Sequence, residues 1–126
     1  MTQTTAQTAD YQLVQQTINH YLTGMTTHDA TLFTKAFHAD ATMKWIEKGY
    51  EEVNAVEALS EHVNSNKPVK TQTSITSISV AGDAASVQLE LKYETFSFID
   101  FMQLLKIDGQ WKIVSKTYAT LPADKS

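Results

Sequence analysis

Asp100 is the residue in this sequence whose type and surroundings most clearly suggest chemistry. It lies between Ile99 and Phe101 in ETFSFIDFMQLLKIDGQWKIVSKTY (94–118), a stretch rich in apolar and aromatic side chains. A carboxylate buried there is costly unless hydrogen bonds or an opposite charge compensate it. Three interpretations are open. Asp100 is a pocket acid, a buried carboxylate that only joins a helix to the sheet, or a carboxylate at a strand bend partly in water.

The other reactive residue types give weaker patterns. The chain has no Cys, which excludes thiol chemistry, disulfides and Cys-bound zinc. No Ser lies in a nucleophile elbow, and the four His residues show no spacing typical of metal ligands. His38 and Asp40 could form an acid–base pair, but their place between a predicted helix and strand favours a local role in the turn. The sequence therefore predicts no metal site and no cofactor.

The charge of the chain restricts its partners. It has ten Lys, no Arg and 14 acidic residues, which gives a net charge of −4. The absence of a basic patch argues against nucleic acid or an anionic membrane as a partner. The absence of Arg argues against bidentate recognition of phosphate or carboxylate groups.

Length and hydropathy indicate a single soluble unit. The 126 residues predict one domain, 1–126, with frayed tails at 1–9 and 121–126. No apolar run reaches the about 18 residues of a membrane span. The opening MTQTTAQTADYQ has neither the basic nor the apolar region of a secretory signal. We therefore expect a cytoplasmic protein.

The first half of the chain has helical periodicity. A helix is predicted from residue 10 to about residue 27, because one face repeats apolar residues at helical spacing. These residues are Val14, Ile18, Tyr21, Leu22 and Met25. Asp29 is a favourable N-cap for a second helix, and an apolar stripe predicts a third helix over 51–65. A short strand over 42–46 lies between the second and third helices.

The second half alternates with the period of a strand. Apolar and polar residues alternate from Val87 to Glu94, and long strands are predicted over 96–107 and 110–119. The dipeptides Gly82–Asp83 and Asp108–Gly109 mark the hairpin turns. Three helices followed by hairpin-linked strands indicate an α+β protein with helices on one face of a mainly antiparallel sheet.

The Asp108–Gly109 turn also sets the register of the last hairpin. With a two-residue loop and no bulge, Lys106 faces Trp111 and Asp100 faces Thr117. This register places Asp100, Met102 and Trp111 on the inner face, towards the helices. The opposite face carries bulky residues, so we expect a homodimer that forms through this outer face. Those residues are Phe101, Leu105, Ile107, Val114 and Tyr118, and Lys116 is predicted on the same outer face.

Three segments resemble the nuclear-transport-factor-two-like superfamily. They are YLTGMTTHDATLFTKAFHADATMKW, AGDAASVQLEL and FIDFMQLLKIDGQWKIVSKTY, and the likeness covers about residues 10–120. The chain is most similar to the small bacterial branch of putative lumazine-binding and SnoaL-like proteins. The resemblance implies a cone of three helices on a strongly curved sheet, with an internal pocket at the wide end.

Within that superfamily, the comparison with ketosteroid isomerase concerns individual residues. The resemblance places Tyr21 and Asp100 at the two hydrogen-bond donors of the isomerase's oxyanion hole. At the position of the isomerase's base stands Trp45, which cannot accept a proton. Glu47, on the same strand face, could act as a displaced base. The isomerase reaction therefore does not transfer with the fold.

Two functional hypotheses follow. The first is a protein that binds a small hydrophobic or aromatic ligand in an aromatic pocket and has no established chemistry. The residues expected to form this pocket are Tyr21, Trp45, Phe98, Asp100, Met102 and Trp111. The second is an isomerase, cyclase or dehydratase that uses Asp100 as acid or base and Tyr21 as its hydrogen-bond partner. The enzyme hypothesis requires a second titratable group that faces the same cavity as Asp100.

Overall fold

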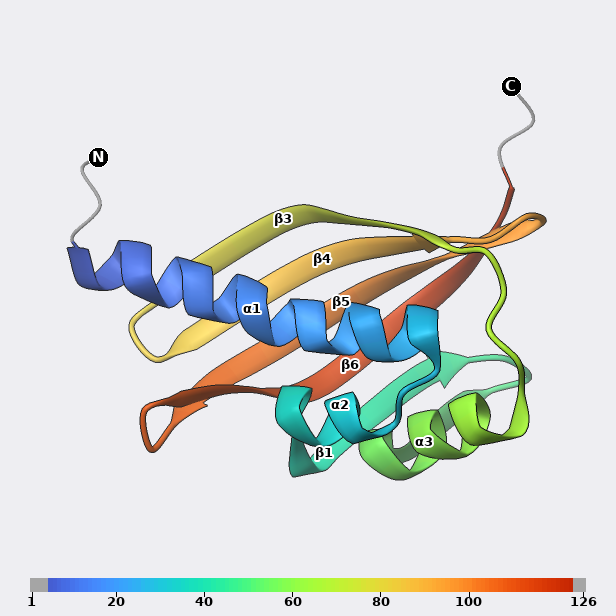
Figure 1. The fold of residues 1–126 in the computed structure, drawn as a ribbon, viewed down its shortest axis with the longest axis horizontal. Coiled ribbons are helices and arrows are strands. Elements are labelled where there is room, and N and C mark those ends of the chain that lie inside the picture. Colours follow the sequence, from blue (N-terminus) through green and yellow to red (C-terminus); the bar gives the residue numbers. More distant parts are fainter. Residues whose placement is uncertain (1–4, 124–126) are drawn as a thin grey trace.

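The computed structural model describes residues 5–123 (Figure 1). Residues 1–4 and 124–126 of the two predicted tails lie outside this range. No helix of the described part is long and apolar enough to cross a membrane. Residues 5–123 form three helices and six strands, in the order α1-α2-β1-β2-α3-β3-β4-β5-β6. The α+β class and the helices packed on a curved sheet are as predicted.

Three helices cover one face of the sheet. They are α1 (Thr5–Thr27), α2 (Thr31–Ala36) and α3 (Ala55–Ser65). The predicted stripe of α1 is buried, and Figure 1 shows this helix crossing the sheet. The helix begins at Thr5, so it includes part of the predicted N-terminal tail. Gly24 allows α1 to approach α2, because a Cβ atom there would lie 2.8 Å from the Phe33 ring.

A tight loop connects α1 to α2. His28 adopts a left-handed conformation with φ of 55°. Asp29 Oδ1 then accepts hydrogen bonds from the backbone N–H and the hydroxyl of Thr31, at 3.1 and 2.6 Å. The N-cap position itself is Ala30, which forms no side-chain cap. Asp29, predicted as the N-cap, therefore satisfies the start of α2 from the position before the N-cap.

The segment before α3 corrects the sequence prediction. Residues 51–54, predicted as helix, belong to strand β2 (Tyr50–Asn54), which pairs antiparallel with β1 (Phe37–Ile46). Asn54 ends the strand, and its side chain accepts a hydrogen bond of 3.0 Å from the Glu57 backbone N–H. The helix starts only after this N-cap because pairing with β1 satisfies the backbone before it.

The sheet is mixed and open. Its remaining strands are β3 (Gln72–Ala81), β4 (Ala84–Lys92), β5 (Phe96–Ile107) and β6 (Gln110–Pro122). The strand order is β2-β1-β6-β5-β4-β3; within the described residues, β1 and β6 pair parallel and the other neighbours pair antiparallel. Both hairpin turns lie where predicted, and Asp108 and Gly109 have the positive φ angles of a type I′ turn.

A β-bulge in β6 changes the predicted register. Leu104 pairs with Ile113, as predicted, but Gln103 pairs with Ser115, so Val114 is the extra residue. Asp100 therefore faces Tyr118 instead of Thr117. Because strand side chains alternate, one extra residue reverses every side chain beyond it. Lys116 and Tyr118, predicted on the outer face, turn to the inner face, and Lys116 is only 4% exposed.

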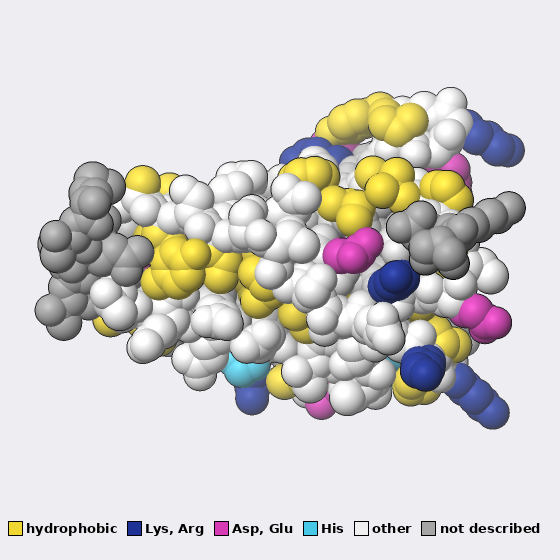
Figure 2. Space-filling model, turned by 90° about the horizontal axis from the view of Figure 1, so that it is seen from above, with side chains coloured by type: hydrophobic (Ala, Val, Ile, Leu, Met, Phe, Trp, Pro, Cys, Tyr) yellow, Lys and Arg dark blue, Asp and Glu magenta, His cyan; other side chains and the backbone are white. Residues whose placement is uncertain are grey.

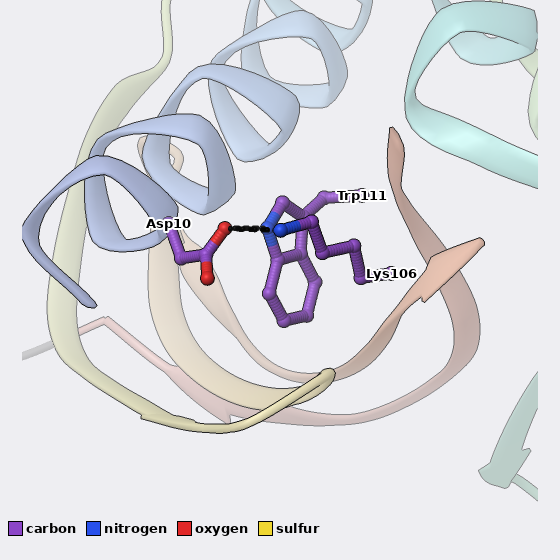
Figure 3. Close-up of polar contacts among 3 residues, drawn as sticks. All are labelled: Asp10, Lys106 and Trp111. Carbon is purple, nitrogen blue, oxygen red and sulfur yellow. Dashed lines mark hydrogen bonds and ion pairs between the residues drawn. The ribbon is translucent and has the colours of Figure 1, made fainter. Parts of the chain in front are cut away.

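The first turns of α1 are attached to the β5–β6 hairpin by a polar contact (Figure 3). Asp10 Oδ1 accepts hydrogen bonds from Lys106 Nζ at 3.0 Å and from Trp111 Nε1 at 3.2 Å. We call these three residues the Asp10 clamp. Further along α1, the Tyr11 hydroxyl donates to the Ile78 carbonyl on β3 at 3.0 Å. These contacts fix the helix across the sheet on both sides.

The surface seen from above in Figure 1 is mostly uncharged. Figure 2 shows few Lys, Asp or Glu side chains there and several separate hydrophobic patches. Exposed large hydrophobic residues occur on several elements, and a scattered distribution of this kind is normal for a folded domain.

Candidate functional site

Tyr21, Asp100 and Lys116 form a buried polar group inside the fold, which we call the buried cluster. The Tyr21 hydroxyl donates a hydrogen bond of 2.6 Å to Asp100 Oδ2. Lys116 Nζ lies 3.9 Å from the same oxygen, within ion-pair distance but too far for a hydrogen bond. Tyr21 and Asp100 are completely inaccessible to solvent. Helix α1 and strands β5 and β6 each contribute one residue.

The electrostatics of the buried cluster keep Tyr21 protonated. Burial raises the pKa of Tyr21 well above its usual value, and the nearby Asp100 carboxylate adds to the effect. Burial also lowers the pKa of Lys116, whereas the Asp100 charge opposes that change. Tyr21 is therefore a fixed hydrogen-bond donor.

Lys116 is also enclosed by aromatic rings. Its ammonium group lies 5.0 Å from the centre of the Tyr21 ring and 4.9 Å from the centre of the Tyr118 ring. Such contacts favour the charged form of an amine. They compensate part of the desolvation that burial imposes on Lys116.

One oxygen of the buried cluster is unsatisfied. Asp100 Oδ1 is buried, and no group in residues 5–123 donates a hydrogen bond to it. A buried acceptor without a partner typically costs about 1–3 kcal/mol. Asp100 therefore keeps the capacity to accept a hydrogen bond from a ligand or a water molecule.

An open cleft of about 930 Å³ lies near the buried cluster. Four parts of the chain form it: the α1–α2 loop, the end of α3, the segment that leads to β3, and the β4–β5 turn. The lining residues are His28, His62, Asn66, Lys67, Val69, Lys70, Gln72, Lys92, Tyr93, Glu94, Thr95, Phe96 and Phe98. This volume is within the range of small-molecule sites, about 300–1,000 Å³.

Three aromatic residues, Tyr93, Phe96 and Phe98, form one side of the cleft, which we call the aromatic wall. Tyr93 and Phe96 are stacked with ring centres 4.8 Å apart, and Phe98 meets both rings edge to face. All three are half-buried, so their rings are partly open to the cleft.

The aromatic wall continues towards the buried cluster. Phe98 contacts Tyr118 at 5.3 Å between ring centres, and Tyr118 lies against both Trp45 and Lys116. Asp100 does not line the cleft. Phe98 and Tyr118 therefore connect the cleft to the buried cluster through ring contacts.

The residues that were expected to form one pocket lie in separate places in the structure. Tyr21 and Asp100 meet in the buried cluster, Phe98 lines the cleft, and Trp45 stacks on Tyr118. Met102 and Trp111 are buried in the hydrophobic core, away from the cleft lining. Trp111 also belongs to the Asp10 clamp. The alternative base, Glu47, is exposed next to the turn between β1 and β2, outside the cleft lining.

Sequence reasoning missed Lys116 and the histidines of the cleft. The His28 ring stands 5.9 Å from the His62 ring. His28 Nδ1 lies 2.7 Å from the Asn66 carbonyl, so this nitrogen carries the proton. Burial, His28 and Lys116 lower the pKa of His62, in that order of size. The neutral form of the His62 ring is therefore favoured.

The comparisons with known proteins agree on the fold. The model of the family described as "Putative lumazine-binding" matches residues 9–119. A search of curated proteins found no match. An NTF2-like protein of unknown function from Shewanella baltica is similar, with 26% sequence identity, a TM-score of 0.84, and coverage of 97% of this chain and 100% of that chain.

Two further solved structures extend this likeness. An NTF2-like protein of unknown function from Methylobacillus flagellatus shares 29% identity, with a TM-score of 0.79 and coverage of 89% of this chain and 92% of that chain. A ketosteroid isomerase-like protein from Erwinia carotovora atroseptica shares 13% identity, with a TM-score of 0.71 and coverage of 88% and 95%. At 13% identity the likeness concerns the fold alone.

Proposed function

Because the chain belongs to the family described as "Putative lumazine-binding", within the NTF2-like superfamily, we propose that it binds a small, planar, largely apolar molecule in the cleft. The observation that carries this proposal is the aromatic wall. Partly open rings on one side of a ligand-sized cleft offer a stacking surface to a planar molecule. Lumazine, which the family description names, is a planar heteroaromatic compound of this class.

A neutral fluorescent probe tests the proposal. N-phenyl-1-naphthylamine is planar and apolar, and its emission increases when it leaves water. We expect saturable binding to the wild type and at least about tenfold weaker binding to Phe96→Ala, because the stacked pair with Tyr93 is lost. The matched control is Tyr50→Ala on β2, outside the cleft lining, where the residue is 65% exposed. Equal binding to the two variants would place the probe outside the cleft and contradict the proposal.

The unsatisfied Asp100 oxygen favours a second candidate function. We propose as the alternative an isomerase, cyclase or dehydratase in which Asp100 exchanges a proton with the ligand and Tyr21 holds the carboxyl group in place. His62 supplies a second titratable group at the cleft. A substrate would reach Asp100 only after Phe98 or Tyr118 moves, because these rings lie between the cleft and the buried cluster.

Proton exchange distinguishes the enzyme from the binding protein. The planar ketone 2-tetralone, incubated with protein in D₂O, would exchange its α-protons faster than in buffer, as followed by NMR. Asp100→Asn should remove the acceleration, and the control Asp10→Asn should retain it. An exchange rate that is the same with wild type and Asp100→Asn would leave binding as the function that the site supports.

We also propose that the protein forms a homodimer through the outer face of the sheet. Phe101 and Leu105 on β5 are 43% and 42% exposed there. Burial of these side chains against a second copy would remove apolar surface from water. Light scattering at micromolar concentration should give the mass of a dimer for the wild type and of a monomer for Phe101→Lys. A wild-type monomer would contradict the proposal.

A further inference from the structure

We propose that the ligand of the cleft is an anion: a planar ring system with a carboxylate, sulfonate or phosphate group at one edge. This inference rests on the proposed binding function and names the class of ligand. It depends on the distribution of charge around the cleft.

Lysines converge on the cleft in a chain that is acidic overall. The protein carries a net charge of −4, yet Lys67, Lys70 and Lys92 all line the cleft. Among residues 5–123, Glu94 is the one carboxylate that lines it. All three lysines are exposed, and none forms an ion pair within the part of the chain that the structure describes. Their ammonium groups are therefore available to a ligand.

The lysines reach the cleft from separate parts of the chain. Lys67 and Lys70 lie between α3 and β3, and Lys92 is the last residue of β4. Like charges brought together repel each other, and a cleft with apolar walls focuses their field. An anionic group in the cleft would remove this repulsion. A neutral molecule would leave it unchanged.

The aromatic wall and the lysines together suggest how the ligand is oriented. The ring system stacks on Tyr93 and Phe96, and Lys92 directly precedes Tyr93 in the chain. Lysine contacts an anion as a point charge, so the site suits one compact charged group and does not require the bidentate geometry of Arg.

Two probes that share a ring system test the charge requirement. 1-Anilinonaphthalene-8-sulfonate carries a sulfonate that N-phenyl-1-naphthylamine lacks. At low salt we expect the anionic probe to bind about five- to tenfold more tightly than the neutral probe. The preference should decrease as salt screens the lysines. Phe96→Ala should weaken the binding of both probes.

Matched lysine variants locate the effect. Lys67→Gln with Lys70→Gln should strongly reduce the preference for the anionic probe, because only Lys92 then remains of the three lysines, and should leave the neutral probe unchanged. The control is Lys35→Gln with Lys48→Gln, which removes the same charge from exposed positions outside the cleft lining. This control should retain the preference.

The outcomes separate the inference from the proposed function. Equal affinities of wild type for the two probes, or equal effects of the two double variants, would overturn the anionic ligand while cleft binding stands. Absence of saturable binding by either probe, or binding that Phe96→Ala does not weaken, would overturn both proposals.

Discussion

Two groups of side chains connect helix α1 to the sheet, and each consists of an Asp, a Lys and an aromatic residue. The Asp10 clamp joins an Asp to a Lys and a Trp, and the buried cluster joins an Asp to a Lys and a Tyr. In the clamp, Asp10 Oδ1 accepts both hydrogen bonds (Figure 3). The Asp10 side chain is 15% exposed. In the buried cluster, Asp100 has no exposure, and its Oδ1 has no donor among residues 5–123.

This difference indicates what each grouping does. Water can complete the hydrogen bonds of a carboxylate at the surface, so the Asp10 clamp is satisfied and needs no further partner. The buried cluster is closed to bulk solvent, and an acceptor without a protein donor is a cost that the fold tolerates next to a ligand-sized cleft. Unsatisfied buried groups of this kind concentrate at functional sites.

The largest expected contrast comes from removing each lysine. Lys116→Met leaves Asp100 buried without a cation, and we expect the free energy of unfolding to fall by about 3–5 kcal/mol. Lys106→Met at the Asp10 clamp should cause a much smaller loss, because water solvates the carboxylate that remains. Urea denaturation of both variants measures the contrast. Similar losses in the two variants would show that the buried cluster does not depend on its charge pair.

A smaller contrast comes from removing the aromatic hydrogen-bond donors. Tyr21→Phe deletes the 2.6 Å hydrogen bond to Asp100, and we expect the unfolding free energy to fall by about 1.5–3 kcal/mol. Trp111→Phe removes the indole donor of the Asp10 clamp, but it also reduces the volume of a core residue. Trp111→Phe is therefore also made in the Asp10→Ala variant. There the indole has already lost its acceptor, so the further fall in unfolding free energy measures the lost packing alone. If Tyr21→Phe left stability unchanged, the Tyr21–Asp100 bond would be dispensable to the fold.

The sequence predicted the pair of the buried cluster but not its cation. Tyr21 and Asp100 were placed together through the family resemblance, which the family match confirms for the fold. Lys116 was assigned to the outer face because the hairpin register was extended past Val114 without a bulge. No Gly or Pro marks that bulge, so local residue types gave no sign of it. Because of this single extra residue, the sequence did not predict that Lys116 lies next to Asp100.

Features of the fold that local residues determine were predictable, whereas features that depend on long-range pairing were missed. The hairpins were predictable because Gly82–Asp83 and Asp108–Gly109 specify their own turns. Strand β2 was missed because Glu51 and Glu52 favour helices, while pairing with β1 decides their conformation. Asn54 was the available signal, since it is a strong N-cap directly before Ala55. The cleft combines residues from three separated parts of the chain, at position 28, over 62–72 and over 92–98, so no sequence window contains its pattern.

The smallest expected effect is the pH dependence of the stability that the Asp10 clamp provides. It tests whether the clamp stabilises the fold electrostatically. Lys106 and then Trp111, through hydrogen bonds to the carboxylate, lower the pKa of Asp10 from 3.8, its usual value. A lowered pKa in the folded state stabilises the fold above the pKa of the unfolded chain, and this contribution is lost as pH falls through the folded value.

Asp10→Asn should therefore be less stable than the wild type at pH 7, and the difference should shrink as the pH falls below about 4. The control Asp83→Asn changes an exposed carboxylate in the β3–β4 turn and should follow the wild type over the same range. Urea denaturation at a series of pH values measures the differences. If the gap between wild type and Asp10→Asn stayed constant from pH 7 to pH 2, its cause would be packing, and the Asp10 clamp would not be an electrostatic contact at all.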